Sequence, residues 1–218
     1  MLAMLTLGFA SGFPFPLVFN TLSLWLQADN MALELIGIFS LSKLPYSFKW
    51  VWAPLIDQIR LPFLHQMGKR RSWAFMAQNL IFVAIISISF STPQQHHFLT
   101  FGLALFLAFS SATLDIALDA YRVENFSSNA QAAASASFVS GYRLGFLFSG
   151  AGALFLAEVM SWNHVYMLMS LGCLIGFITI LIMPEPHNST FIPKSYQNLT
   201  NFLHNTLIAP LKNFIKHQ

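Results

Sequence analysis

Two aspartates within one apolar stretch are the residues in this sequence best suited to chemistry. Asp115 and Asp119 lie four residues apart in a long apolar run that begins near Phe98, so on a helix they share one face. Arg122 follows Asp119 by three residues and lies on that face too. A charged side chain in the middle of a membrane helix costs roughly 2.5–3.5 kcal/mol on insertion scales. The acids therefore indicate a water-filled transport pathway, or else they cap and pair at the cytoplasmic end of the helix.

The composition is that of a polytopic membrane protein. Of the 218 residues, 56% are hydrophobic and 9% are charged, whereas soluble domains carry roughly 25% charged residues. The net charge of +3 comes from basic residues in a few connections and does not indicate a nucleic-acid partner. One cysteine, Cys173, excludes an intrachain disulfide framework. No nucleotide-binding loop, nucleophile motif or metal-ligand spacing occurs, so we expect no enzyme, no cofactor and no metal.

Six apolar stretches are long enough to cross a bilayer as helices, which needs about 20 residues each. Their apolar runs are continuous and lack the alternation of a membrane barrel, so we predict an all-α polytopic membrane protein. The first stretch is expected to break or kink near Pro14. Beyond Met183, residues 184–218 are predicted to form a cytoplasmic tail with an amphipathic helix on the inner membrane surface. The predicted spans are residues 2–26, 34–56, 72–91, 98–121, 132–157 and 163–183.

Basic residues in alternate connections predict the orientation of the chain. Lys and Arg occur between the second and third spans, at Arg122, and in the tail, whereas the other connections contain none. Both termini are therefore expected to be cytoplasmic.

Three basic residues lie inside predicted spans and need polar surroundings there. Lys43 is near the middle of the second span, and Arg143 is about halfway along the fifth. Lys49 is within snorkelling distance of the cytoplasmic face. We expect Lys43 and Arg143 to face the bundle interior, with Tyr142 presenting a polar edge to a cavity. An ion pair between Arg143 and Asp115 would be either a proton-coupling element or a static link between two helices.

Small residues at four-residue intervals predict close helix packing in two spans. Gly8 and Gly12 make such a face in the first span. Four small residues beginning at Gly141 make a second one in the fifth span.

Six short motifs follow one another along the chain. They are Leu7-Gly-Phe-Ala-Ser-Gly-Phe-Pro14, Ile36-Gly-Ile-Phe-Ser-Leu41, Phe48-Lys-Trp-Val-Trp-Ala-Pro-Leu-Ile-Asp57, Gly68-Lys-Arg-Arg-Ser-Trp73, Asp115-Ile-Ala-Leu-Asp-Ala-Tyr121 and Gly141-Tyr-Arg-Leu-Gly145. In this order they closely resemble the AmpG family of muropeptide permeases, within the major facilitator superfamily. The resemblance extends from about residue 5 to the end and includes Ala209-Pro-Leu-Lys-Asn-Phe214 in the tail.

The resemblance implies a six-transmembrane-helix half of a major facilitator superfamily carrier in the bacterial inner membrane. Such carriers import anhydro-muropeptides, are thought to be driven by the proton gradient, and bind substrate near the midplane between two halves. Because the chain stops where a seventh helix would begin, the implied partners besides the lipid bilayer are a second half-carrier or a second copy. The candidate residues for the substrate and proton pathway, called the pathway residues below, are Lys43, Lys49, Asp115, Asp119, Tyr142 and Arg143.

The same resemblance implies a cytoplasmic latch between the two halves. Asp57 and the run from Gly68 to Arg71 match the signature loop of the superfamily between helices two and three. The local alternative is a positive-inside loop with a helix-end cap, which needs no latch. The candidate latch residues are Asp57, Gly68, Lys69, Arg70, Arg71 and Arg122.

Two other functions compete with muropeptide import. Carriers of acetyl-CoA or of another anionic solute are related in pattern, and cations in the cavity suit any polyanion. The rival from another class is a truncated, non-transporting membrane protein with a regulatory or inert role.

Overall fold

The computed structural model describes residues 1–62, 64 and 67–185, and every regular element in this part of the chain is a helix. The predicted amphipathic helix of the tail lies outside the described residues. In chain order the elements are α1 (Leu2–Gly12), α2 (Pro14–Val18), α3 (Asn20–Ala28), α4 (Leu33–Phe39), the 3-10 turn η1 (Ser40–Lys43), α5 (Leu44–Phe48), the 3-10 turn η2 (Lys49–Val51), α6 (Ala53–Gln58), α7 (Lys69–Ser89), α8 (His97–Asn125), α9 (Ser128–Ala157), α10 (Trp162–Ser170) and α11 (Cys173–Ile182).

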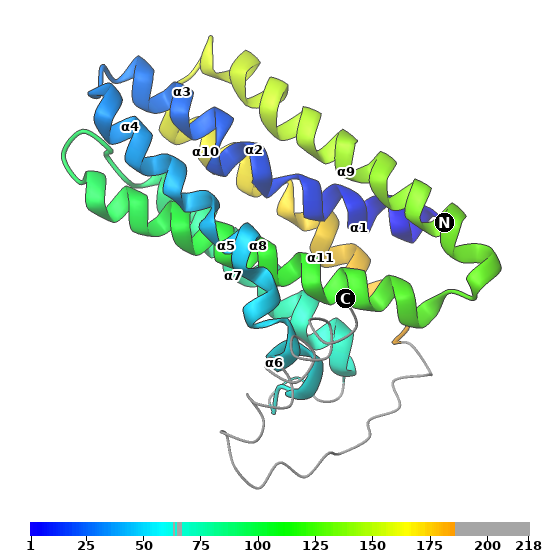
Figure 1. The fold of residues 1–218 in the computed structure, drawn as a ribbon. Coiled ribbons are helices and arrows are strands. Elements are labelled where there is room, and N and C mark those ends of the chain that lie inside the picture. Colours follow the sequence, from blue (N-terminus) through cyan, green and yellow to red (C-terminus); the bar gives the residue numbers. More distant parts are fainter. Residues whose placement is uncertain (63, 65–66, 186–218) are drawn as a thin grey trace, which may run out of the picture.

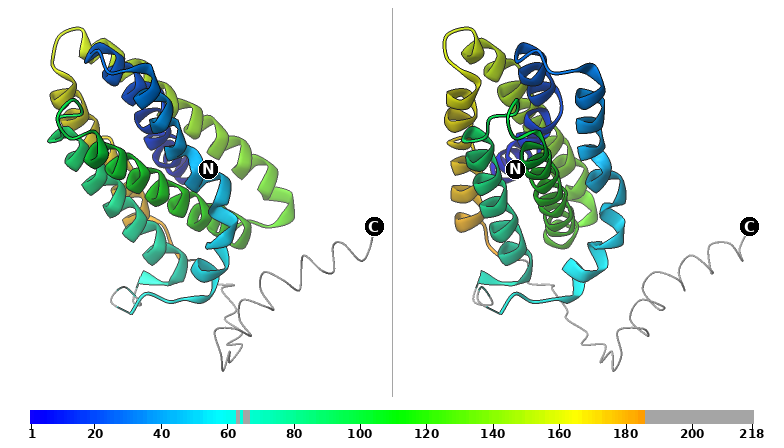
Figure 2. Two further views of the ribbon diagram at one scale, coloured as in Figure 1. Left: turned by 60° about the vertical axis from the view of Figure 1, so that its left-hand side comes forward. Right: turned by 90° about the vertical axis from the view of Figure 1, so that its left-hand side faces the viewer.

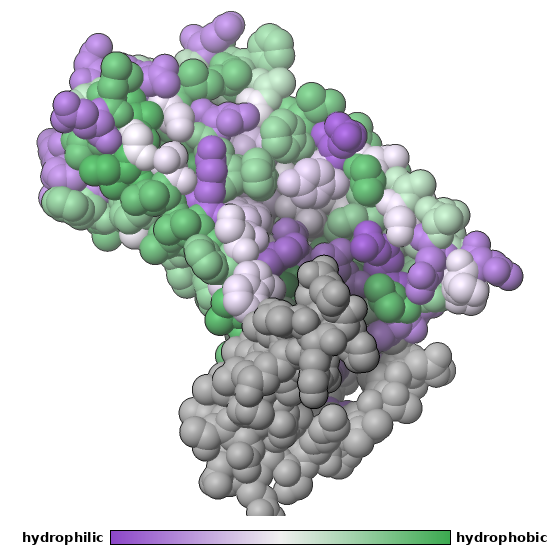
Figure 3. All heavy atoms as spheres, viewed as in Figure 1, coloured by the Kyte–Doolittle hydropathy of each residue, from purple (hydrophilic) through white to green (hydrophobic). Residues whose placement is uncertain are grey.

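Five helical stretches of the described chain are long and apolar enough to cross a membrane. They lie side by side in an elongated bundle (Figure 1). The face drawn in Figure 3 carries many hydrophobic residues, with hydrophilic ones between them. The predicted all-α polytopic class is therefore confirmed. The five stretches are Leu2–Ala28, Lys69–Ser89, His97–Asn125, Ser128–Ala157 and Trp162–Ile182.

The second predicted span, residues 34–56, is a series of short segments instead of one continuous helix. In the run from α4 to α6, two 3-10 turns, η1 and η2, interrupt the α-helical geometry. Pro45 and Pro54 stand in the first turns of α5 and α6, where the missing N–H is tolerated. The segments nevertheless follow one direction along α8 (Figure 2).

The first span breaks where predicted. α1 ends at Gly12 and α2 begins at Pro14, because a proline cannot donate the hydrogen bond that would continue the ladder. A second break follows at Phe19, between α2 and α3.

The two predicted small-residue faces pack against each other, which confirms their packing role. α1 and α9 make the most extensive helix contact of the described chain. A Cβ at Gly8 would overlap the backbone carbonyl of Phe138, and one at Gly141 would overlap that of Leu5. The backbones of α1 and α9 therefore touch, and only glycine permits this approach.

Two groups of helices lie on opposite sides of the bundle, and the helices differ in how deeply they are buried. In Figure 2, α7, α10 and α11 lie on one side of the bundle and α4–α6 on the opposite side. Of an apolar 18-residue segment of α8 (His97–Asn125), 61% is buried inside the bundle. The corresponding segment of α9 (Ser128–Ala157) is only 22% buried. α8 is therefore central, and α9 exposes most of its surface beyond its contact with α1.

Candidate functional site

Asp115 lies on α8 close to α1. The hydroxyl of Ser11 on α1 donates a hydrogen bond to Asp115 Oδ1 at 2.5 Å, and Ser11 is buried. A short bond to a carboxylate is among the stronger hydrogen bonds in proteins. Ser11 was not predicted as a site residue, since it stands in a motif whose small residues we interpreted only as packing.

The expected ion pair between Arg143 and Asp115 is not formed in the described part of the chain. The physical reason is helix packing, since α9 packs chiefly against α1 and contacts α8 only briefly. Arg143 is exposed and, with Tyr142, lines a cavity of about 400 Å³ on the outer flank of α9. Tyr142 is the residue of this pair that interacts electrostatically with Asp115. Tyr142 and Arg143 have different neighbours because successive side chains on a helix point in different directions.

Asp119 lies one turn further along α8 and has two cationic neighbours. Lys49 Nζ lies 4.0 Å from Asp119 Oδ2. Arg122 Nη2 donates to Asp119 Oδ1 at 3.1 Å. The side chains of Lys49 and Asp119 are 38% and 47% exposed, and such a pair stabilises a fold by only about 0–1 kcal/mol. The structure therefore brings these three predicted residues together at a surface that water can reach.

Lys43 forms no ion pair with the acids of the described residues. It is exposed on the flank of α4–α6, and its Nζ lies 5.2 Å from the centroid of the Phe19 ring. A cation over an aromatic face is attracted by the ring quadrupole. The expectation that Lys43 faces the interior of the bundle is therefore not met in the described part of the chain.

Arg70 is the centre of a cluster at the start of α7, called the Arg70 cluster here and formed with Asp57 and Glu124. Its Nη1 donates to Asp57 Oδ1 at 2.6 Å, and its Nε lies 3.0 Å from both carboxylate oxygens of Glu124. Arg70 Nη2 also donates to Glu124, and Lys69 Nζ donates to the backbone carbonyl of Asp57. Arg70 is 6% exposed, so two carboxylates surround one buried guanidinium.

Glu185 caps the N-terminus of α7 from the far end of the described chain. Its carboxylate accepts hydrogen bonds from the backbone N–H groups of Arg70 at 2.9 Å and Arg71 at 3.1 Å. Gly68 has a φ of +86°, and a Cβ there would overlap the Glu185 side chain. A carboxylate at a helix N-terminus is favoured by the unpaired N–H groups and the helix dipole.

Arg71, at the start of α7, binds backbone carbonyls at the end of α11. Its Nε donates to the carbonyl of Ile180 at 3.1 Å, and its Nη2 donates to that of Leu181 at 2.7 Å. The start of α7 is thus tied to the end of α11. Arg122, which was predicted with the latch residues, pairs with Asp119 instead, and its guanidinium lies 5.3 Å from the Phe138 ring centroid.

Glu124 and Glu185 are the two acids of this region that we did not predict from the sequence. Glu185 stands between Pro184 and Pro186, a pattern that we interpreted only as a helix stop. Glu124 follows Arg122 by two residues, and nothing local indicates that it reaches Arg70 instead. Their sequence separations from Arg70, 54 and 115 residues, explain why the pattern did not reveal them.

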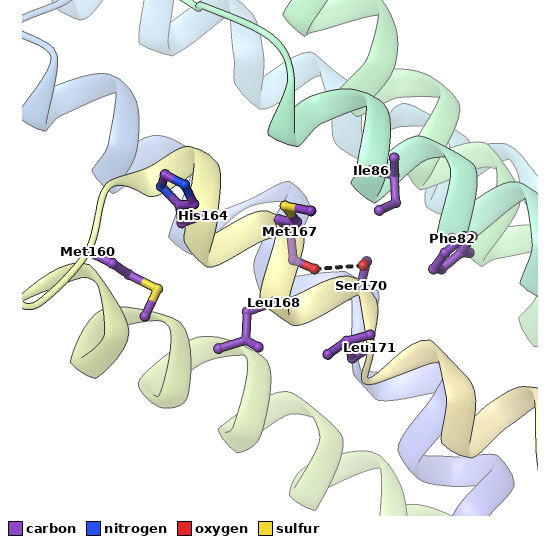
Figure 4. Close-up of a pocket in the computed structure, with 8 residues that line it drawn as sticks. All are labelled: Phe82, Ile86, Met160, His164, Met167, Leu168, Ser170 and Leu171. Carbon is purple, nitrogen blue, oxygen red and sulfur yellow. Dashed lines mark hydrogen bonds between the residues drawn. The ribbon is translucent and has the colours of Figure 1, made fainter.

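A separate apolar pocket of about 670 Å³ lies between α7 and α10 (Figure 4). Its one lining hydroxyl, on Ser170, donates to the carbonyl of Met167 at 2.7 Å and is therefore satisfied. None of the pathway residues lines it, so we do not include it in the candidate site. The lining residues are Phe82, Ile86, Met160, His164, Met167, Leu168, Ser170 and Leu171.

Comparisons with known proteins relate nearly the whole chain to transporters. The family model described as acetyl-coenzyme A transporter 1 matches residues 1–105. The anhydromuropeptide permease of Escherichia coli (strain K12) is 38% identical over 212 residues, which cover 97% of this chain and 41% of that protein. A protein named as transporter AmpG 4 in Rickettsia felis is 35% identical over 214 residues, which cover 97% of this chain and 51% of that protein. The chain spans about half the length of these relatives.

Proposed function

The chain is a homologue of the AmpG family of permeases, and from this premise we propose that it is the amino-terminal half of a proton-coupled importer of anhydro-muropeptides. The observation that carries the proposal is the 38% identity, over 97% of the chain, to a protein named anhydromuropeptide permease. The coarser conclusion, a multi-pass membrane protein related to transporters and not to enzymes, does not depend on the substrate.

The distribution of cations supports an anionic substrate. Lys43, Lys49 and Arg143 lie on the flanks formed by α4–α6 and by α9, which are the most exposed parts of the described bundle. Muropeptides carry several carboxylates, which these cations would attract. In this superfamily the substrate binds near the midplane between two halves. We therefore place the substrate against these flanks, where a second half would close the cavity.

The surroundings of Asp115 support proton coupling. Its partner is the Ser11 hydroxyl and not a cation, so no ion pair in the described residues neutralises it. An unpaired carboxylate within a membrane span is costly. Protonation removes this cost, and we propose that Asp115 binds the coupling proton during transport.

We propose that this half-carrier pairs with a second half, which another polypeptide or a second copy of this chain can supply. Two halves related by an axis along the membrane normal share one orientation, so either source is geometrically possible. We place the assembly in the bacterial inner membrane with both termini cytoplasmic. The Arg70 cluster would then lie at the cytoplasmic end, where we propose that it latches the halves.

Acetyl-CoA is the second candidate substrate. The family model that matches residues 1–105 is described as acetyl-coenzyme A transporter 1. Acetyl-CoA is also polyanionic, so the same cations would suit it.

An uptake experiment with two labelled substrates tests the proposal. The chain would be expressed in a permease-null strain, alone and with the carboxy-terminal half of the Escherichia coli permease. We expect vesicles with both halves to accumulate anhydro-muropeptide, and the same vesicles with a collapsed proton gradient to lose accumulation. Accumulation of acetyl-CoA instead would favour the second candidate. Uptake of neither substrate, with or without the second half, would favour a non-transporting protein.

A further inference from the structure

Two cavities on the exposed side of α9 share part of their lining. The first, of about 400 Å³, is lined by Tyr142 and Arg143. The second, of about 210 Å³, lies between α9 and the start of α3, where Asn20 lines it. Phe146 and Leu147 line both cavities. The two cavities therefore meet at these residues and form one continuous groove, called the α9 groove below.

The α9 residues of this groove form a single stripe along the helix, which runs beside α1, α2 and α3 (Figure 1). They recur at intervals of three and four residues, so they share one face. With a rise of about 1.5 Å per residue, the stripe extends for roughly 22 Å. An extended peptide residue spans about 3.5 Å, so the groove has room for an elongated solute. The stripe consists of Val139, Tyr142, Arg143, Phe146, Leu147, Gly150, Ala151 and Leu154.

Arg143 is the cation of the α9 groove. It stands near the middle of α9 and is exposed, and it makes no ion pair or hydrogen bond with the described residues. A cation at the middle of a membrane span is costly unless an anion or water surrounds it. The planar guanidinium suits an oxyanion, either a carboxylate or a phosphate, which it can bind through two parallel hydrogen bonds.

Asn20 gives the second cavity a polar group of another kind. It is the first residue of α3, and its exposed amide has no hydrogen-bond partner in the described chain. Its neighbour Thr21 donates to the Ser149 carbonyl at 3.4 Å and so joins α3 to α9. An amide both donates and accepts hydrogen bonds, so Asn20 can pair with an amide of a ligand. Where the two cavities meet, Phe146 and Leu147 present an apolar surface.

We propose that the α9 groove binds an elongated anionic solute, with an oxyanion on Arg143, an amide on Asn20 and its apolar part on Phe146. The proposal rests on the proposed function and adds which groups of the substrate are recognised by which residues. In an anhydro-muropeptide these groups are a carboxylate and an amide of the peptide. In acetyl-CoA they are a phosphate and an amide of its pantetheine arm.

A binding experiment with two forms of one ligand tests the oxyanion site. The full chain with its companion half, in lipid nanodiscs, would be titrated calorimetrically with anhydro-muropeptide and with the same compound after its carboxylates are converted to amides. We expect the wild type to bind the amidated form at least about tenfold more weakly, since hydrogen bonds to charged groups are strong. Arg143→Ala should weaken binding of the acidic form by at least about tenfold and leave that of the amidated form unchanged.

Asn20→Ala tests the second cavity. It should weaken binding of both ligand forms alike, by about two- to tenfold, because both keep the peptide amides. Two matched controls remove similar exposed groups outside the groove. Arg60→Ala removes an arginine in the connection after α6, and Gln27→Ala removes an amide near the end of α3. Both controls should bind like the wild type. Arg143→Lys keeps the charge without the planar fork and should therefore restore only part of the affinity.

Wild-type affinities in both Arg143→Ala and Asn20→Ala would overturn the proposed groove. An Arg143→Ala variant that binds both ligand forms equally more weakly would overturn the oxyanion site, as would a wild type that binds both forms with equal affinity. The comparison of the two forms on the wild type needs no variant, so it tests the proposal even if a variant misfolds.

Titration with acetyl-CoA separates this proposal from the proposed function. Binding of acetyl-CoA but not of muropeptide, weakened at least about tenfold by Arg143→Ala, would support the groove and contradict muropeptide import. Muropeptide uptake by the wild type, with unchanged muropeptide binding in both groove variants, would contradict the groove alone. Binding of neither ligand by the wild type would contradict both proposals.

Discussion

At the scale of single residues, the neighbours of each charge decide what it can do. Asp115 is bonded by a neutral hydroxyl, Asp119 by two cations, and Arg70 by two carboxylates. Only the first of these arrangements leaves a charge without a countercharge. Protonation or substitution is therefore expected to affect Asp115, Asp119 and Arg70 to different extents.

Asp115→Asn should uncouple transport from the proton gradient. The amide cannot bind the proton, so accumulation driven by a gradient should fall by at least about tenfold. Exchange of labelled for unlabelled substrate, which moves no net proton, should persist. Both rates would be measured in vesicles containing the chain and a companion half, with Asp29→Asn as the control in a loop. Proton-dependent accumulation by Asp115→Asn would exclude the coupling role.

Arg70→Ala should destabilise the fold. It leaves the carboxylates of Glu124 and Asp57, whose side chains are 25% and 50% exposed, without the guanidinium that bonds both of them. Removing one partner of a fully buried pair costs about 3–5 kcal/mol, and partial exposure lowers our expectation to about 1–3 kcal/mol. Arg70→Lys should recover only part of the loss, because one ammonium cannot make the bidentate contact.

Thermal unfolding in detergent would measure the Arg70 effect. The matched control is Lys43→Ala, which removes an exposed cation that lies over the Phe19 ring. Its effect should stay within about 0.5 kcal/mol. Equal unfolding temperatures for the Arg70 and Lys43 variants would contradict the central role of Arg70.

At the scale of elements, two joints hold the bundle together. The first is the contact of α1 with α9, where backbone meets backbone. The second ties α7 to α11 through Glu185 and Arg71. One joint depends on the absence of side chains, whereas the other depends on particular side chains.

Gly8→Ala and Gly141→Ala should each disturb the α1–α9 contact. The added methyl group would overlap a backbone carbonyl, and overpacking of this kind costs about 1–3 kcal/mol. The control is Gly102→Ala on α8, where the Cβ meets nothing within 4 Å. That variant should gain about 0.5–1 kcal/mol from helix propensity. Unfolding temperatures that fall in all three variants would show that space at the glycine is not the cause.

Glu185→Ala should loosen the first turn of α7. The N–H groups of Arg70 and Arg71 lose their acceptor, and loss of a helix cap costs about 1 kcal/mol. Amide hydrogen exchange at these two residues should accelerate about fivefold, which corresponds to that free energy. Glu185→Gln keeps an acceptor oxygen, so its exchange rate should lie between those of the wild type and Glu185→Ala. Unchanged exchange in Glu185→Ala would show that other groups cap α7.

At the scale of the whole molecule, the pathway residues and the apolar pocket lie on different parts of the bundle. The pathway residues lie on α4–α6, α8 and α9, whereas the apolar pocket lies on the opposite side between α7 and α10 (Figure 2). If the proposed function holds, the side with the pathway residues faces the second half and the side with the apolar pocket faces lipid.

Water accessibility should follow these flanks. In a Cys173→Ser background, cysteines replacing Asp119 or Arg143 should react with a water-borne maleimide when a companion half is present. Cysteines replacing Phe82 or Leu168 in the apolar pocket should not react. Mass spectrometry would give the labelled fraction of each variant. If cysteines at positions 119 and 143 do not react while a cysteine at position 82 does, our placement of the pathway is wrong.

The sequence alone determined the all-α membrane class, the break at Pro14, the two small-residue faces and the relation to AmpG permeases. These features depend on local composition and spacing, which the linear chain displays directly. It also indicated that Asp57 and Arg70 belong together, because both match one motif.

Only the tertiary structure decided which charges meet. Arg143 and Asp115 stay apart because α9 packs against α1. Residue types and their spacing do not predict which helices pack together. Glu124 and Glu185 join Arg70 and α7 from distant parts of the chain, where helix packing alone sets the neighbours. The hydroxyl of Ser11 reaches Asp115 for the same reason: α1 and α8 must fold together before their polar atoms meet.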